Sequence, residues 1–205
     1  MAGREREDMR TRTLLAQACA KIMAEEGVRD FKVAKRKAAQ RMGMTLHVLM
    51  PSNQEIQNAL VEYQRLFLSD IHDELLVKLR QGAMDAMKYL KQFRPRLVGP
   101  VLDGTAVKGG EVQLHLFSDS IEDVQLFMME RDIPVKLSGR RYRSGGGDVN
   151  VFPTFEFGAG DLNYEITVFP LSAEREAPKS PVDGKPMRRA SLHELEHICG
   201  ALVHE

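Results

Sequence analysis

The spacing of apolar residues changes near residue 94, and this change limits what the chain can fold into. Before it, apolar residues recur at helical intervals. After it, short stretches alternate apolar and polar residues between Gly-rich turns, which is the pattern of strands with one buried face. The sequence therefore predicts an α+β protein, in which a helical region, residues 1–93, packs on a mixed-sheet domain, residues 94–205, that ends in a helix.

The helical region is expected to hold three main helices. The first ends at Gly27 and the second, which is basic, ends near Gly43, because glycine tolerates the backbone conformation that follows a helix. The third begins where Ser52 and Glu55 have the spacing of a capping box. Gly82 is expected to interrupt or end this long helix, after which the chain continues as helix.

The sheet domain is expected to contain five strands and two helices. A helix should begin at Ser120, with Asp123 as its capping partner, and the last helix should begin at Ser191. Matched alternation predicts that residues 112–117 and 164–169 are neighbouring strands, with the 120–132 helix packed on them. The expected strands lie within residues 97–102, 112–117, 134–143, 150–157 and 163–170.

Composition excludes several classes of function. The 205 residues include 29 Lys plus Arg and 29 Asp plus Glu, so the net charge gives no general attraction to nucleic acid or acidic membranes. The two cysteines, Cys19 and Cys199, form no disulfide pattern, and the charged N-terminus lacks the apolar stretch of a signal peptide. No apolar run reaches 18 residues. We expect a cytoplasmic protein with no membrane partner, and the sequence does not indicate its oligomeric state.

One stretch near the end has the spacing of a zinc protease. His193-Glu194-x-x-His197 could place two imidazoles on one Zn²⁺, with the glutamate as a base. However, Ser191 and Glu194 also form a capping box, which already uses the glutamate. At about 100° per residue the two histidines fall on the solvent side of the helix. We therefore expect no zinc at His193 and His197.

More chemistry is expected on the first long strand of the sheet domain. Alternate residues of a strand share a face, so Glu111, Gln113 and His115 point to the side opposite Val112, Leu114 and Leu116. In the last expected strand, Glu165 points to one face of the sheet, whereas Tyr164 and Ile166 point to the other. If the two strands are neighbours, Glu165 joins Gln113 and His115 on a single polar surface.

This arrangement resembles the nucleotidyltransferase fold shared by small nucleotidyltransferases and polymerase-like enzymes, over residues 94–170. Gly104-Thr105 looks like the family's Gly-Ser turn, and Glu165 looks like its third acid. The resemblance implies a nucleoside triphosphate partner, contacted by Gly104 and Thr105. It also implies a divalent metal, Mg²⁺ or Mn²⁺, at Glu111, Gln113, His115 and Glu165. A looser likeness is to small bacterial proteins that carry this domain behind a helical N-terminus.

The chain departs from the family where the two metal-binding acids should lie. Gln113-Leu114-His115 occupies the positions of the acid-x-acid pair, and shifting the frame to Glu111-Val112-Gln113 recovers one acid. Two alternatives stay open: the chain retains the fold and has lost ordinary two-metal catalysis, or it holds its metal differently. We expect a nucleotidyltransferase-like protein that binds or acts on nucleotide or nucleic acid, with reduced or atypical metal chemistry.

A different class of function is a non-enzymatic adaptor that binds nucleic acid through local basic patches. The basic helix 32–41 offers Lys35 and Arg36 to phosphates, within a stretch that resembles the first two helices of TetR-type repressors. The hairpin 139–148 offers three arginines around Tyr142, a combination that can grip single-stranded nucleic acid. An ordinary solvated helix and a charge-protected hairpin edge explain the same residues. The three hairpin arginines are Arg140, Arg141 and Arg143.

Overall fold

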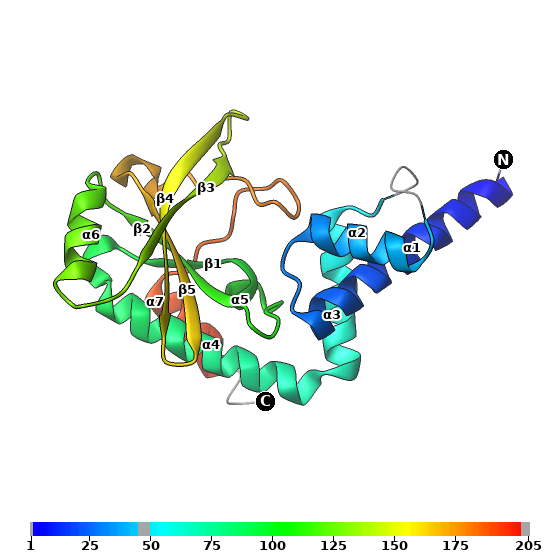
Figure 1. The fold of residues 1–205 in the computed structure, drawn as a ribbon, viewed down its shortest axis with the longest axis horizontal. Coiled ribbons are helices and arrows are strands. Elements are labelled where there is room, and N and C mark those ends of the chain that lie inside the picture. Colours follow the sequence, from blue (N-terminus) through cyan, green and yellow to red (C-terminus); the bar gives the residue numbers. More distant parts are fainter. Residues whose placement is uncertain (1, 45–49, 202–205) are drawn as a thin grey trace. The chain divides into compact units, whose positions relative to one another are not determined.

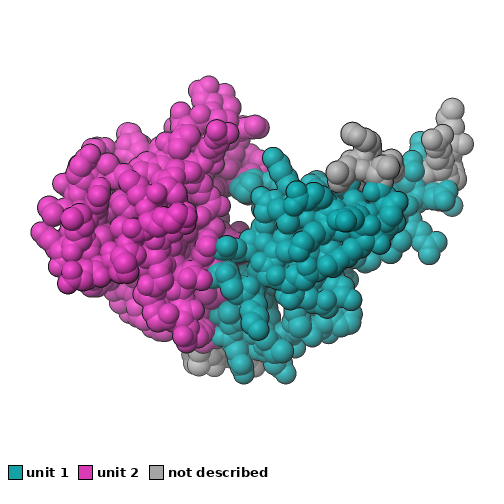
Figure 2. Space-filling model, in the orientation of Figure 1, with its two compact units in different colours: residues 1–75, 105–110, 181–183 teal, residues 76–104, 111–180, 184–205 magenta. Residues whose placement is uncertain are grey.

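The structure is a computed structural model that describes the backbone of residues 2–44 and 50–201. Its described part contains seven α-helices and a five-stranded mixed sheet, so the expected α+β class is confirmed (Figure 1). The chain divides into two compact units, coloured separately in Figure 2. The helical unit comprises residues 1–75, 105–110 and 181–183, and the sheet unit comprises residues 76–104, 111–180 and 184–205. The division between the two units falls inside a helix, after residue 75.

The helical unit is built around three helices, α1 (Ala2–Glu26), α2 (Phe31–Arg41) and α3 (Asn53–Phe67). Their contact faces are small and aliphatic, which lets the helices approach closely. The core residues include Leu15, Cys19, Ala34, Ala38, Ile56 and Leu60, each at most 2% exposed. Gly27 ends α1 in the left-handed conformation, as expected from the sequence.

The start of α3 shows how local sequence sets a helix boundary. The Ser52 side chain accepts a hydrogen bond from the Glu55 amide, and Glu55 accepts one from the Ser52 amide at 2.7 Å, so the expected capping box is confirmed. Arg12 of α1 donates to the same carboxylate at 2.6 Å. This ion pair lowers the pKa of Glu55 to about 2, with the Ser52 hydrogen bonds adding to the effect.

The sheet unit has strand order β1-β2-β5-β4-β3. Strands β2 and β5 are parallel and every other neighbouring pair is antiparallel. The strands are β1 (Arg96–Val98), β2 (Glu111–Phe117), β3 (Lys136–Arg143), β4 (Val149–Ala159) and β5 (Leu162–Phe169). The helices are α4 (Ser69–Tyr89), α5 (Gly99–Asp103), α6 (Ile121–Met129) and α7 (Leu192–Ala201).

Helices cover one face of this sheet, and the other face carries polar side chains together with a buried aromatic cluster of Phe117, Tyr142 and Phe169. Val112, Leu114 and Ile166 on the helix-covered face are fully buried. Helix α6 starts at Ser120, whose hydroxyl accepts the Asp123 amide at 3.1 Å, as predicted. The strand pairing predicted from alternation is also confirmed, because β2 and β5 are hydrogen-bonded neighbours along their whole length.

Two expectations about backbone elements are wrong. Gly82 does not interrupt a helix: α4 runs through it, and the break falls at Leu68 between α3 and α4. Gly82 is required because β5 lies against the helix there, and a Cβ would collide with Leu162 and approach the Tyr164 hydroxyl. The expected strand at residues 97–102 is a strand only to Val98 and then turns into α5.

Among the helices that the structure describes, none combines the length and apolar character needed to cross a membrane.

Candidate functional site

The polar face of the sheet carries the residues that the sequence singled out. In the register of β2 and β5, Gln113 lies opposite Glu165 and His115 lies opposite Thr167. On the far side of β5, Glu165 faces Glu156 of β4. The face therefore holds a row of Gln113, Glu165 and Glu156 across three strands, and a second row that starts at His115. The shared polar surface expected for Gln113, His115 and Glu165 is confirmed.

The second row is a buried chain of hydrogen bonds. Arg189, from the segment before α7, donates from Nε to His115 Nδ1 at 3.1 Å. A guanidinium can only donate, so Nδ1 must be the acceptor and the imidazole proton lies on Nε2. Nε2 then donates to the Tyr142 hydroxyl at 3.3 Å, and Tyr142 donates to Thr167 Oγ1 at 3.2 Å. Thr154 ends the chain, 3.1 Å from Thr167 and within reach of the Phe152 carbonyl.

This network holds His115 neutral. The side chain is 1% exposed and lies against the ring of Phe169. Burial lowers the pKa of His115 well below its usual value, and the charges of Arg189 and Arg140 lower it further. Because both ring nitrogens are already hydrogen-bonded in a closed site, His115 is not available as a metal ligand here. This corrects the expectation that it belongs to the metal set.

Arg189 is the residue that closes the site, and sequence reasoning missed it. Its Nη1 donates to the Ala173 and Glu174 carbonyls, at 2.8 and 3.3 Å, and its guanidinium lies over the rings of Phe117 and Phe169. Burial lowers the pKa of Arg189 to about 10, which leaves it charged at neutral pH. Residues 171–190 have the composition of a loop, with no periodicity to show that this loop returns across the sheet.

The carboxylates of the first row are matched by cations. Glu165 forms an ion pair with Arg140 of β3. Glu156 accepts from Lys136 at 3.2 Å and from the Ser138 hydroxyl at 2.7 Å. Glu156 was also missed, although its position in the alternation of "FPTFEF" places it on this face. The row is therefore close to electrically balanced.

The turn that approaches this row is Gly99, not Gly104-Thr105. Gly99 follows β1 directly with φ of 70°, and a Cβ there would collide with the Gln113 amide. Gly104 lies at the opposite end of α5, where a Cβ would lie 3.8 Å from Nη2 of Arg80. Thr105, the next residue, is buried. Gly104 lies at the end of α5 away from β1 and Gln113, and Thr105 belongs to the helical unit.

Oxygen donors for a metal ion are therefore few on this face. Within residues 5–44 and 50–200, no three His, Cys, Asp or Glu side chains gather closely enough to hold an ion. Glu111 is half-buried and lies opposite Asn163, two residues before Gln113 on the same face of β2. Gln113 thus has two carboxylate neighbours on this face, Glu165, its register partner on β5, and Glu111, two residues earlier on β2.

The basic patches are used in part by the fold. On α2, Lys35 donates to Asn53 at 2.8 Å, while Arg36 is exposed. The hairpin places Tyr142 inward and 8% exposed, so this ring offers no stacking surface for a base. The expected cluster of three arginines around an aromatic ring is therefore divided: Arg140 lies on the polar face with Glu165, whereas Arg141 and Arg143 are exposed on the opposite side.

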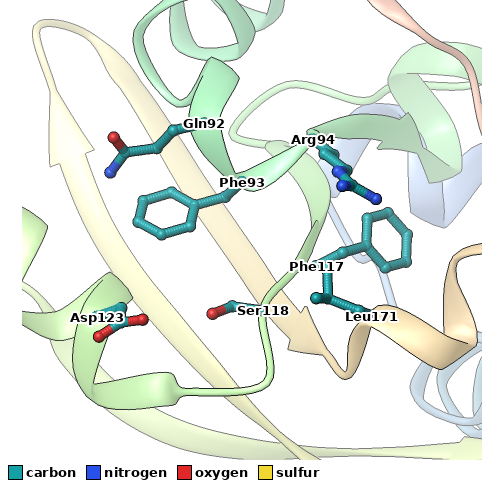
Figure 3. Close-up of a pocket in the computed structure, with 7 residues that line it drawn as sticks. All are labelled: Gln92, Phe93, Arg94, Phe117, Ser118, Asp123 and Leu171. Atoms are coloured by element: carbon teal, nitrogen blue, oxygen red, sulfur yellow. The ribbon is translucent and has the colours of Figure 1, made fainter.

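A hollow of about 420 Å³ lies at the carboxyl ends of β2 and β5 (Figure 3). Carboxyl ends of parallel strands are the usual edge for ligands. Arg94, in the left-handed conformation, pairs with Glu174 at 2.9 Å. None of the predicted site residues lines this hollow. Its walls are Gln92, Phe93, Arg94, Phe117, Ser118, Asp123 and Leu171.

The last helix begins as predicted. The Glu194 carboxylate accepts from the Ser191 amide at 2.6 Å and from its hydroxyl at 2.7 Å. These hydrogen bonds lower the pKa of Glu194. His193 and His197 are exposed, with ring centroids 5.4 Å apart. The glutamate of the zinc-protease spacing is thus a helix cap in this fold.

Comparison with protein-family models gave no match, and comparison with curated proteins gave none either.

Proposed function

We propose that the sheet unit is a nucleotidyltransferase-like domain that binds a nucleoside triphosphate on its polar face and has lost ordinary two-metal nucleotidyl transfer. The proposal rests on the resemblance of residues 94–170 to that fold. The observation that carries it is the convergence of three segments: the Gly99 backbone lies against Gln113, and Gln113 lies in register with Glu165. A turn after the first strand, a polar residue on the second and an acid on a later strand are the parts that the resemblance requires.

The loss of catalysis follows from the charges of those parts. Two-metal transfer needs several carboxylates to offset two dications. Here Gln113 is neutral, His115 is sealed in the Arg189–Tyr142 network, and Glu165 is paired with Arg140. Without an imidazole ligand there is also no reason to expect a preference for Mn²⁺ over Mg²⁺. The proposed binding is therefore weak and depends on oxygen ligands.

One substitution tests this placement. Gln113→Glu keeps the side-chain shape and adds a carboxylate between Glu111 and Glu165. We predict that it tightens Mg²⁺-dependent binding of ATP by about ten-fold, or about 1.4 kcal/mol. Titration calorimetry with Mg²⁺-ATP on wild type and variant measures the change. Gln125→Glu is the matched control, because it adds the same charge at an exposed position of α6.

The outcomes separate the two parts of the proposal. Equal affinity for wild type and Gln113→Glu would refute the location of the site. Turnover of Mg²⁺-ATP by the wild-type protein would refute the loss of catalysis. An equal gain in Gln125→Glu would show that net charge, and not this row, governs the binding.

A second candidate function is nucleic-acid contact by the outer side of the β3–β4 hairpin. The observation in its favour is that Arg141 and Arg143 are exposed and, in the part of the chain that the structure describes, form no ion pair. Each phosphate contact contributes to the salt dependence of binding. In the double variant Arg141→Gln/Arg143→Gln, the slope of log affinity against log salt for an oligonucleotide should fall by about 2. An unchanged slope would exclude the hairpin.

A further inference from the structure

Strand β3 forms one edge of the sheet and presents backbone groups to its open side. Within the described part of the chain, no strand pairs with β3 on the side away from β4 (Figure 1). Opposite residues of an antiparallel pair alternate between exchanging hydrogen bonds and pointing their amides and carbonyls away. Gly139 lies opposite Pro153, which has no amide, so this pair belongs to the second kind. By the same alternation, the backbone groups of Leu137, Gly139 and Arg141 point away from β4.

Two hydrogen bonds near the hairpin turn agree with this alternation. The Ser144 amide donates to the Asp148 carbonyl at 2.8 Å, so the next pair, Arg143 and Val149, is of the outward-pointing kind. Accordingly, the Arg143 carbonyl accepts from the Lys179 amide at 2.8 Å on the open side. The edge therefore already accepts a backbone donor at one end. Among the described residues, no backbone partner of this kind reaches residues 137–141.

The side chains beside this edge are aliphatic and basic. Because opposite residues share a face, Leu137, Arg141 and Arg143 lie on one face of the hairpin with Val149 and Val151. Helices cover this face over β2 and β5, but here the three aliphatic side chains are 52%, 54% and 61% exposed. The two arginines are exposed as well. The outer part of the hairpin is thus an apolar surface with a basic end.

Charge decides which kind of strand this edge can accept. Strand β3 has four cationic side chains and no acidic one in its eight residues. Two of the cations form ion pairs with glutamates of the polar face, whereas Arg141 and Arg143 form none within the described residues. Like charges on directly opposing strands are destabilising, and charges on an edge keep like strands apart. A second copy of β3 is therefore disfavoured, and an acidic strand is favoured.

The same edge fits a polypeptide better than a nucleic acid. Phosphate oxygens could contact Arg141 and Arg143, but they only accept hydrogen bonds and cannot satisfy the outward carbonyls of β3. They would also leave the three aliphatic side chains exposed. An added strand supplies both backbone donors and acceptors, and its alternate side chains can contact the neighbouring surface.

We propose that β3 is a docking edge for an extended, acidic segment of a partner protein, which adds to the sheet as a further strand. Its amides and carbonyls would pair with those of Leu137, Gly139 and Arg141. Its carboxylates would lie beside Arg141 and Arg143, and its aliphatic side chains beside Leu137. The edge is separate from the polar-face row where nucleotide binding is proposed, so Gln113→Glu should not alter peptide binding.

A synthetic peptide, Thr-Glu-Thr-Glu-Thr-Val-Thr-Val-Thr, labelled at one end, tests the mode of binding by fluorescence anisotropy. In antiparallel register its glutamates lie opposite Arg143 and Arg141, and its valines lie opposite Gly139 and Leu137. The amides of the glutamates and valines then face β3, whereas those of the threonines face away. N-methylation of one glutamate and one valine should weaken binding about ten-fold, since it removes backbone hydrogen bonds. N-methylation of two threonines is the matched control and should leave the affinity unchanged.

Variants of the protein test the charge match. Arg141→Gln/Arg143→Gln should weaken binding of the unmodified peptide about five-fold, the loss typical of two exposed ion pairs. Lys91→Gln/Lys108→Gln removes the same charge from exposed positions outside the hairpin and should bind like wild type. All four positions are exposed, so the variants should fold, which circular dichroism checks.

Four results would overturn the proposal. The first is no saturable binding of the unmodified peptide, and the second is an equal loss from both methylation patterns, which would exclude strand addition. The third is an equal loss in both double variants, which would mean that net charge alone attracts the peptide. The fourth is another occupant: either an oligonucleotide that needs Arg141 and Arg143 while the peptide does not bind, or a dimer of the protein, seen by sedimentation, that blocks the edge.

Discussion

The buried imidazole of His115 should make the stability of the protein depend on pH in a defined direction. Burial lowers the pKa of His115 in the folded state, whereas the unfolded chain has a histidine pKa of about 6.5. The unfolded state therefore binds the proton more readily. The contribution of His115 to the free energy of unfolding is complete above pH of about 6.5 and is lost as the pH falls below that value.

The magnitude follows from the linkage relation. One group that is protonated only in the unfolded state costs up to about 1.4 kcal/mol per pH unit, so a fall from pH 6.5 to pH 5 removes about 2 kcal/mol. Around His115 the charged and titratable neighbours are Arg189, Arg140 and Tyr142. Neither arginine favours a protonated imidazole, and the Arg189 Nε–H occupies the lone pair that would accept the proton.

The assay compares wild type with His115→Gln, whose amide can still accept from Arg189 and donate to Tyr142 but does not titrate. Urea unfolding is followed by circular dichroism and by tyrosine fluorescence at pH 8, 7, 6 and 5. At pH 8 the variant should be less stable by about 1–3 kcal/mol, the cost of imperfect buried hydrogen bonds. As the pH falls, wild type should lose stability faster than the variant. The difference between their free energies of unfolding should therefore narrow by about 2 kcal/mol. A gap that stays constant from pH 8 to pH 5 would refute the neutral, buried imidazole.

Other predictions concern the backbone and the ion pairs of the sheet unit. Gly99→Ala should lower the free energy of unfolding by more than about 1 kcal/mol, because φ is 70° and the new methyl group meets Gln113, and urea unfolding measures this loss. Ser191→Ala removes the cap of α7 and should cost about 1 kcal/mol in the same assay, whereas an unaffected midpoint would contradict the capping role. Glu165→Gln should leave Arg140 without its partner and increase the affinity of the polar face for ATP without metal, which calorimetry can detect; weaker binding would contradict this.

Several features of the candidate site follow from local sequence. The alternation in β2 and β5 places Gln113 and Glu165 on one face and Leu114 and Ile166 on the other, because successive strand side chains point to opposite sides. Helix starts are equally local. Ser52 and Ser191 satisfy the amides of their own first turns, so their spacing from the following glutamates was enough to predict them.

Other features depend on contacts between residues far apart in the chain. Alternation says which side chains share a face, but not whether a distant segment covers that face. Arg189 reaches His115 across 74 positions of sequence and turns an expected metal ligand into a buried, neutral hydrogen-bonding group. Gly82 was expected to end a helix and is instead the place where β5 approaches it. Gly99 was overlooked in favour of Gly104, because only strand pairing brings its backbone against Gln113. The sequence alone thus determined the classes of element, their caps and the faces of their side chains. The tertiary structure decided which polar groups are buried and hydrogen-bonded and which stay exposed. Contacts between segments far apart in the chain produce no local periodicity in the sequence, so periodicity could not predict them.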